Sequence, residues 1–320
     1  MREYVRTFCD SFEYPQEAKE VLLLSYDKLK ADILEEQFKK HIKLFENNEL
    51  VDYGETIREL DDIACKISTH RYTIHLLFLI CLSKHTKKLY DEQGISEKIY
   101  VDTMYDLKIK AFECYQLYDV WGNFVAAEWE FGILDLSIFA LGRLQFAPTK
   151  FEGTYSKNGH TIHPGDTVID VHIPSGTGLR YEDCMKSYQE AEKFFEKRFL
   201  GSVTPFVCYS WLLYPPNKEI LPENSNILKF IKDYDMINVS VDEEKTDLWR
   251  IYYKEANKVP VDLPRTTSLQ RAYADWLSQG NKVGLGHDSN RYCTTLAALS
   301  ADNCQLEAIL LPLIIGTLSV

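Results

Sequence analysis

The sequence predicts an α+β protein in which a helical region precedes a domain built on a mixed β-sheet. Three observations support this prediction. Apolar residues recur at helical spacing up to about residue 120, strand-like alternation with turn signals follows residue 122, and residues 167–199 read as strand, glycine loop and helix. We therefore expect a helical domain over 1–120, a mixed domain over 121–287 and an atypical tail over 288–320.

The helical region contains five segments that the sequence predicts to be helices. Its fourth segment includes the continuous apolar run IHLLFLICL at 74–82, which is too short to span a bilayer. A helix that is apolar on all sides must be surrounded by other elements. We therefore expect the apolar run around 76–82 to be the buried centre of a helical bundle.

The stretch 167–199 is the part around which we expect the second domain to be organised. TVIDVHIP alternates β-branched and polar residues as a strand does, and Ser175-Gly176-Thr177-Gly178 follows as a loop before a helix over 179–199. Unpaired N–H groups at a helix start attract anions, so this loop could cradle the pyrophosphate of a nucleotide-type cofactor. The alternative is a tight turn without a ligand, because neither GxGxxG nor GxxxxGK[ST] is present.

The remaining elements of the second domain follow from alternation, turn residues and helical spacing. The predictions are a strand at 138–146, a hairpin within 151–166, a strand bounded by Pro205 and Pro215, a hairpin of 236–243 with 247–256, and an amphipathic helix at 265–280.

The last residues have a different composition. After Tyr292 there is no Lys or Arg, and Asp302 and Glu307 are the only acidic residues. The segment has neither helix caps nor strand alternation. We expect either a non-native tail or a docking segment that contributes little to the second domain.

Charge and cysteine usage exclude several classes of function. The formal net charge of −12 disfavours binding to nucleic acid and to anionic membranes. The eight cysteines form no CxxC pair and no zinc signature, and there is no HExxH, so no metal is expected. The N-terminus has no apolar signal segment, which predicts a cytoplasmic protein with reduced thiols.

Several stretches of the second half resemble one family. They are LGRLQF (141–146), DVHIPSGTGL (170–179), CMKSYQEAEKFF (184–195), CYSWLL (208–213), NSNILKF (224–230) and TSLQRAYADWLSQG (267–280). In order and spacing they resemble bacterial acyltransferase-domain proteins, which have a helical N-acyltransferase N-terminal domain and a GNAT-like C-terminal domain. The first half resembles the family only in its general helical pattern.

The resemblance implies a site for acyl-CoA or acetyl-CoA as co-substrate. It assigns the pyrophosphate to the loop Ser175, Gly176, Thr177, Gly178 and Leu179, and it places Asn226 where such folds contact the CoA arm. The loop keeps only the glycine spacing of the usual Gln/Arg-x-x-Gly-x-Gly/Ala pattern. Asn226 could instead cap its helix, although Asn224 or Ser225 could also do so.

Three side chains are the candidates for catalysis. His172 lies on the same strand face as Asp170 and, titrating near neutral pH, could deprotonate an incoming ammonium. Ser210 or Tyr209 could protonate the departing thiolate. Alternatively, His172 is bonded to a neighbouring loop, or it activates Cys208 or Ser210 as a nucleophile, although the GxSxG elbow is absent.

The function we predict is direct transfer of an acyl group from acyl-CoA to the amine of a small molecule or peptide. The departure from the usual phosphate loop leaves one alternative, a non-catalytic GNAT-like module for sensing or scaffolding.

Overall fold

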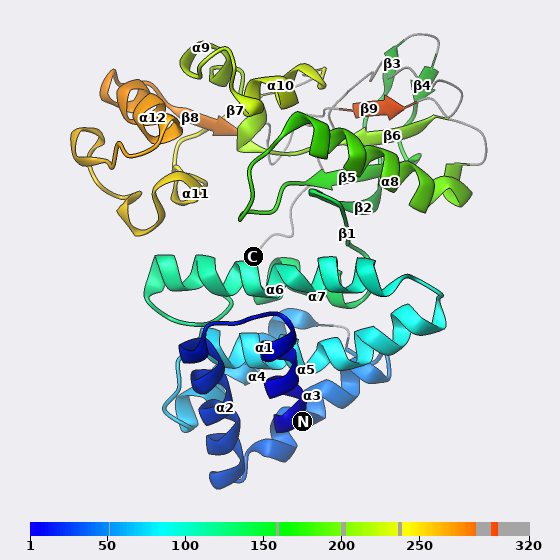
Figure 1. The fold of residues 1–320 in the computed structure, drawn as a ribbon, viewed down its shortest axis with the longest axis vertical. Helices are drawn as coiled ribbons and strands as arrows, with labels where there is room; N and C mark the ends of the chain where they lie inside the picture. Colours follow the sequence, from blue (N-terminus) through cyan, green and yellow to red (C-terminus); the bar gives the residue numbers. More distant parts are fainter. Residues whose placement is uncertain (51, 158–159, 200–202, 236–238, 286–295, 300–320) are drawn as a thin grey trace. The chain divides into compact units, whose positions relative to one another are not determined.

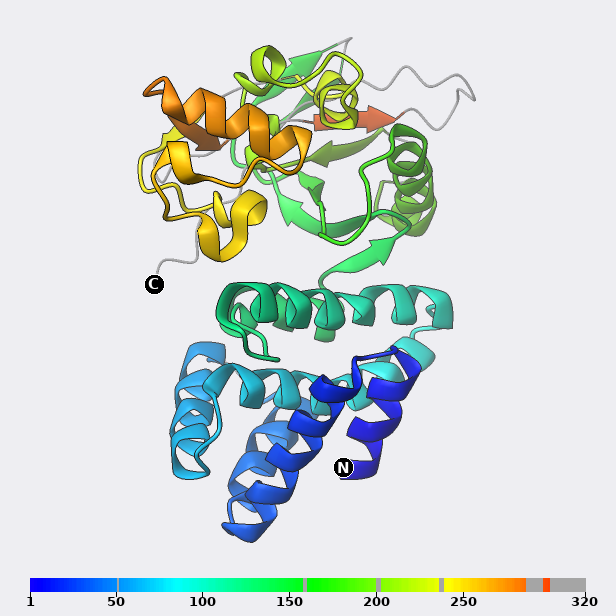
Figure 2. The ribbon, with the colours of Figure 1, turned by 60° about the vertical axis from the view of Figure 1, so that its left-hand side comes forward.

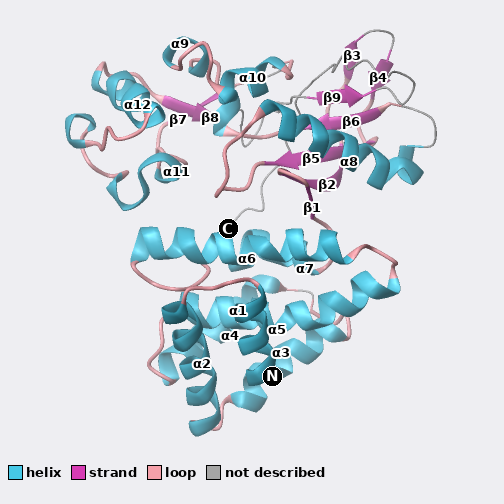
Figure 3. Ribbon diagram, in the orientation of Figure 1, coloured by secondary structure: helices cyan, strands magenta, loops and turns pink. Residues whose placement is uncertain are grey.

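The computed structural model describes residues 1–50, 52–157, 160–199, 203–235, 239–285 and 296–299. The chain divides into two compact units, residues 1–139 and 140–320 (Figure 1). Helices build the first unit, and all described strands begin at or after Phe139 (Figure 3). The predicted α+β class, with helices first and a mixed sheet second, is confirmed.

The first unit is organised around one buried helix. Its helices are α1 (Arg2–Ser11), α2 (Gln16–Ala31), α3 (Glu35–Glu46), α4 (Tyr53–Lys66), α5 (Arg71–Glu92), α6 (Glu97–Tyr118), the π-helix η1 (Ala126–Glu130) and α7 (Phe131–Leu134). Every residue from Thr73 to Ser83 on α5 is buried, and α1, α2, α3, α4, α6 and α7 all contact this helix. The expectation that the run around 76–82 is the buried centre is therefore confirmed.

The second unit contains a mixed sheet. Its strands are β1 (Phe139–Leu141), β2 (Leu144–Lys150), β5 (Thr167–His172), β6 (Thr204–Val207) and β9 (Leu296–Leu299), in the order β1-β2-β5-β6-β9. Neighbouring strands pair antiparallel for β2–β5 and β6–β9 and parallel for β5–β6. Apart from β9, the predicted tail 288–320 lies outside the described residues.

The parallel pairing of β5 and β6 is short. It joins Ile169 to Phe206 and Asp170 to Val207, and it ends there although β5 continues to His172. Beyond Val207 the chain forms the 3₁₀ helix η2 (Trp211–Leu213). The predicted strand between Pro205 and Pro215 is therefore wrong after Val207, and the two central strands are not paired where β5 ends.

The helix α8 (Tyr181–Phe199) lies against one face of this sheet (Figures 1 and 2). The ring of Tyr188 lies 6.1 Å from that of Phe146 on β2 and 5.1 Å from that of Phe206 on β6. Because side chains alternate along a strand, Ile169 and Val171 share this face, while Val168, Asp170 and His172 point to the other. On that other face, Phe151, Val168 and Val207 form a separate buried cluster.

Two predictions for the strands of this unit are wrong. The expected single strand 138–146 is two strands, because the chain turns at Gly142, whose φ is +71°. The expected hairpin of 236–243 with 247–256 is also wrong. β7 (Ser240–Asp242) instead pairs with β8 (Val283–Leu285), and Trp249–Tyr252 is the helix α11.

The remaining elements are short. They are the hairpin β3 (Tyr155–Lys157) and β4 (His160–Ile162), α9 (Asn217–Ile220), α10 (Asn226–Lys232), the 3₁₀ helices η3 (Tyr253–Glu255) and η4 (Pro260–Asp262), and α12 (Ser268–Ser278). The β3–β4 hairpin within 151–166 and the helix within 265–280 match the expectation.

The turn between β1 and β2 offers a test of this packing. A Cβ at Gly142 would lie 2.7 Å from Ser187 Oγ on α8, at a φ that L-residues rarely adopt. Gly142→Ala should lower the free energy of unfolding by about 2 kcal/mol. Gly153→Ala is the control, since a Cβ there meets nothing closer than 3.9 Å. Urea unfolding measures both, and equal stability of the two variants would contradict the described turn.

Candidate active site

The end of β5 brings an acid and a base together. Asp170 and His172 are two residues apart on the face opposite α8, and Asp170 Oδ2 lies 3.3 Å from His172 Nε2. Both side chains are largely buried, with 17% and 21% exposed. Asp170 is also the last residue of β5 that pairs with β6, so this pair lies where the two strands cease to be joined.

Burial determines the charge of both groups. It raises the pKa of Asp170 to about 7, against a small opposing effect of the Val171 backbone, and it lowers the pKa of His172 to about 3. The prediction that His172 titrates near neutral pH is therefore wrong. The imidazole is neutral at physiological pH, and the carboxyl is the group of the pair that changes charge there.

Strand β2 supplies the polar and small neighbours of this pair. In the antiparallel register, Gln145 lies opposite His172 and Ala147 lies opposite Asp170. Gln145 is buried, with 2% of its surface exposed. Paired residues of adjacent strands present their side chains on the same face, so the side chain of Gln145 lies on the same face of the sheet as those of Asp170 and His172. The sequence analysis did not single it out, because the register that places it there is not encoded locally.

The loop after β5 carries backbone donors without acceptors. Among the described residues, no hydrogen-bond acceptor is found for the N–H groups of Gly176, Thr177, Gly178 and Leu179. Gly176 has φ +102°, and a Cβ at Gly178 would meet nothing within 4 Å. Helix α8 begins at Tyr181 rather than at the predicted residue 179. The exposed loop and the first turn of α8 together form a donor-rich surface that suits an anion.

The side chain of Arg143, which follows the β1–β2 turn residue Gly142, is hydrogen-bonded to this loop. Its Nε donates to the carbonyl of Gly178 at 3.1 Å, and its Nη2 donates to the carbonyl of Thr177 at 3.0 Å. The contact joins residues more than thirty positions apart, so no local pattern could have revealed it.

The hydrogen bonds of Ser210 and Ser225 show how the helices η2 and α10 are capped. Ser210 Oγ accepts a hydrogen bond from the N–H of Leu212 at 3.1 Å and so caps η2. Ser225 Oγ caps α10 by accepting from the N–H of Ile227 at 3.2 Å. Asn226 is therefore not needed as a cap.

Cys208 and Tyr209, the two residues before Ser210, differ in solvent exposure. Tyr209 is partly exposed just beyond the end of β6, whereas Cys208 is buried with 2% of its surface exposed. The burial of Cys208 does not favour it as a nucleophile, because reactive cysteines lie in partly exposed, electropositive surroundings.

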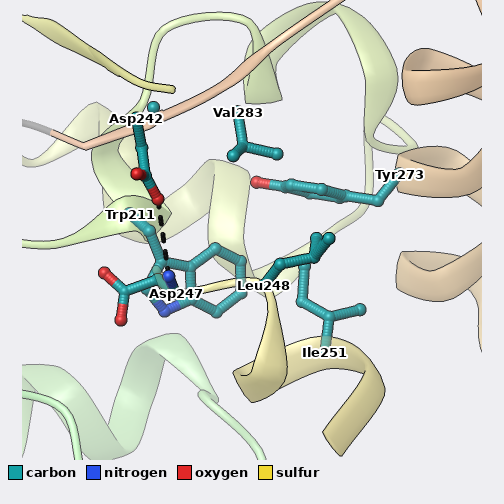
Figure 4. Close-up of a pocket in the computed structure, with 8 residues that line it drawn as sticks. Trp211, Asp242, Asp247, Leu248, Ile251, Tyr273 and Val283 are labelled. Carbon is teal, nitrogen blue, oxygen red and sulfur yellow. Dashed lines mark hydrogen bonds between the residues drawn. The ribbon is translucent and has the colours of Figure 1, made fainter. Parts of the chain in front are cut away.

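A small pocket lies elsewhere in the second unit (Figure 4). Trp211, Tyr273, Leu248, Asp242 and Asp247 are among the residues that line it. Its cavity leaves only about 10 Å³ of space for a water-sized molecule, far below the volume of about 300–1,000 Å³ usual for small-molecule sites. None of the predicted site residues lines it.

Among the described residues, no three His, Cys, Asp or Glu side chains gather as a metal site would require. Nor does any helix among them have the length and apolar character needed to cross a membrane.

Comparisons with known proteins were made against family models, curated proteins and solved structures. Residues 3–134 match the N-acyltransferase N-terminal domain, and residues 138–288 match the GNAT-like C-terminal domain. No curated protein matches the chain.

Among solved structures, an acyltransferase in complex with decanoyl-CoA and teicoplanin is 18% identical, with a TM-score of 0.66, over 88% of this chain and 86% of that one. An acyltransferase variant with octanoyl-CoA is 18% identical, with a TM-score of 0.67, over 88% and 87%. At this identity the likeness shows a shared fold. The two family matches together cover most of the chain, which is therefore an N-acyltransferase-domain protein with a GNAT-like C-terminal domain.

Proposed function

We propose that this protein transfers an acyl group from acyl-CoA to an amine by direct attack, without a covalent enzyme intermediate. The observation that carries the proposal is the layout at the end of β5. Its pairing with β6 ends at Asp170, and β5 then leads into a loop in which the N–H groups of residues 176–179 have no acceptor among the described residues. Similar acyltransferase structures contain decanoyl-CoA or octanoyl-CoA, which supports acyl-CoA as the donor.

The loop suits the pyrophosphate of CoA. The N–H groups of 176–179 would donate to the phosphate oxygens, with Ser175 at the entrance and the first turn of α8 adding its dipole. The open space at Gly178 permits close approach of an anion to the backbone. The pantetheine would pass between β5 and β6 where they are not paired. Asn226, at the first turn of α10, is the proposed contact to the CoA arm.

The chemistry is attack of the amine nitrogen on the thioester carbonyl carbon. The carbon–sulfur bond breaks, and the thiolate leaves with the electron pair. A main-chain N–H of β5 beyond Asp170 would stabilise the tetrahedral oxyanion, and Tyr209 or Ser210 would protonate the thiolate. Holding both reactants in one cleft supplies much of the rate.

The Asp170–His172 pair would take the proton of the ammonium. The neutral imidazole can accept it, but a buried imidazolium is unfavourable on its own. The Asp170 carboxylate at 3.3 Å supplies the compensating charge, and a carboxyl whose pKa is about 7 can hold the proton near neutral pH.

The acceptor we propose is an amine on a small molecule or a peptide. A similar acyltransferase was crystallised with teicoplanin as well as decanoyl-CoA, which favours a peptide-like acceptor. The net charge of −12 is compatible with a cationic amine.

Calorimetric titration with decanoyl-CoA tests the donor site. Gly178→Val places a branched side chain in the open space of the loop without the strain of a positive φ. We expect the Kd to rise by about tenfold or more. Thr177→Val is the matched control, because it puts the same side chain in the same loop at a position that already carries a branched side chain of similar size, and so adds no bulk. An unchanged Kd for Gly178→Val would remove the loop from the donor site, and a wild-type chain that binds no acyl-CoA would favour the scaffold alternative.

Steady-state kinetics across pH test the proton acceptor. His172→Gln should leave acyl-CoA binding intact and slow turnover by about a hundredfold. In the wild type, kcat/KM should increase as pH rises through the Asp170 pKa of about 7, because only the ionised carboxylate can stabilise the proton on the pair. Asp170→Asn should remove this rise. Wild-type turnover in His172→Gln, or an unaltered pH profile in Asp170→Asn, would contradict the assignment.

A further inference from the structure

We propose that Arg143 is a positioning residue that aims the loop N–H groups at the pyrophosphate of acyl-CoA. The inference rests on the proposed function and extends it to a residue on a different hairpin. The guanidinium donates through Nε and Nη2 to two consecutive carbonyls, those of Gly178 and Thr177. It contacts the loop backbone rather than a side chain, so it fixes the orientation of the peptide groups themselves.

The geometry of the peptide bond converts these contacts into a direction for the donors. In a trans peptide group, the C=O and the following N–H point to opposite sides, and the described residues contain no cis peptide bond. The carbonyl of Thr177 shares its peptide group with the N–H of Gly178, and the carbonyl of Gly178 shares its group with the N–H of Leu179. Because both carbonyls face Arg143, both N–H groups face away from it.

Most of the loop is exposed to solvent. Ser175, Gly176, Thr177 and Gly178 are all exposed, and Leu179 is the first buried residue after them. Glycine populates many backbone conformations, so an unrestrained loop would have to be ordered at the expense of binding free energy. Two hydrogen bonds from a charged donor remove that cost before the ligand arrives.

Arg143 is itself held in place by α8. Ser187 Oγ accepts hydrogen bonds from the N–H groups of Arg143 at 2.6 Å and Leu144 at 3.3 Å. The same hydroxyl donates to the carbonyl of Asp183 at 3.0 Å. The β1–β2 turn, α8 and the loop therefore form a closed arrangement. Burial lowers the pKa of Arg143, but arginine remains protonated in proteins.

Variants of Arg143 can distinguish the effect of its two hydrogen bonds from the effect of its positive charge. Arginine presents its donors in a rigid planar fork, which matches two acceptors at once, whereas lysine is a flexible point charge. Arg143→Lys keeps the charge and loses the fork, and Arg143→Met loses both. Lys186→Met is the control, because Lys186 is exposed on α8 and its loss changes the net charge equally.

The experiment compares donors with and without the pyrophosphate. Calorimetry on the full chain gives the Kd of coenzyme A, and kinetics give KM and kcat for decanoyl-CoA and for S-decanoyl-pantetheine, which lacks the nucleotide. We expect Arg143→Met to raise the Kd of coenzyme A and the KM of decanoyl-CoA by about tenfold or more. Arg143→Lys should fall between Arg143→Met and wild type, and Lys186→Met should match wild type. The KM for S-decanoyl-pantetheine and both kcat values should stay unchanged.

Several outcomes would overturn the inference. Wild-type affinity for coenzyme A in Arg143→Met, or in Arg143→Lys, would show that the fork does not position the loop. An equal rise in KM for both donors would show a general structural loss instead. If Arg143→Met does not fold, Arg143→Lys carries the comparison. A wild-type chain that binds no coenzyme A overturns the proposed function and this inference with it, whereas intact binding in the variants overturns this inference alone.

Discussion

Pairing between β5 and β6 ends at Asp170 and Val207, although β5 continues to His172. The features of the proposed site depend on this interruption. The two central strands are unpaired at the point where an acid and a base lie on one face. The loop that precedes α8 follows directly after this point. Packing of Phe146, Tyr188 and Phe206 on the opposite face holds the strands together up to that point.

Burial gives the Asp170–His172 pair its chemical character. In water the imidazole would be the titrating group near neutral pH, but inside the sheet the order is reversed, with the carboxyl at about 7 and the imidazole at about 3. A buried carboxylate and a buried imidazolium are each unfavourable alone. The distance of 3.3 Å between Asp170 Oδ2 and His172 Nε2 lets the charge of one group compensate that of the other. We therefore assign proton transfer to the pair and not to His172 alone.

The local parts of this arrangement could be predicted from the sequence. Strand, loop and helix over 167–199, the buried run around 76–82 and the cap near Ser225 follow from alternation, composition and side-chain chemistry. The non-local parts could not. Nothing near Ser240 shows that β7 pairs with residues 283–285, and nothing near Arg143 shows its contact with Gly178. The pKa of His172 was mispredicted because it depends on burial, which alternation does not report.

The most direct test of the account is a crystal structure of the full chain grown with decanoyl-CoA. The account predicts pyrophosphate oxygens at about 3 Å from the backbone nitrogens of Gly178 and Leu179, with the pantetheine between β5 and β6 and the thioester beside His172. A pyrophosphate bound away from the 175–179 loop, or a thioester remote from the end of β5, would contradict it.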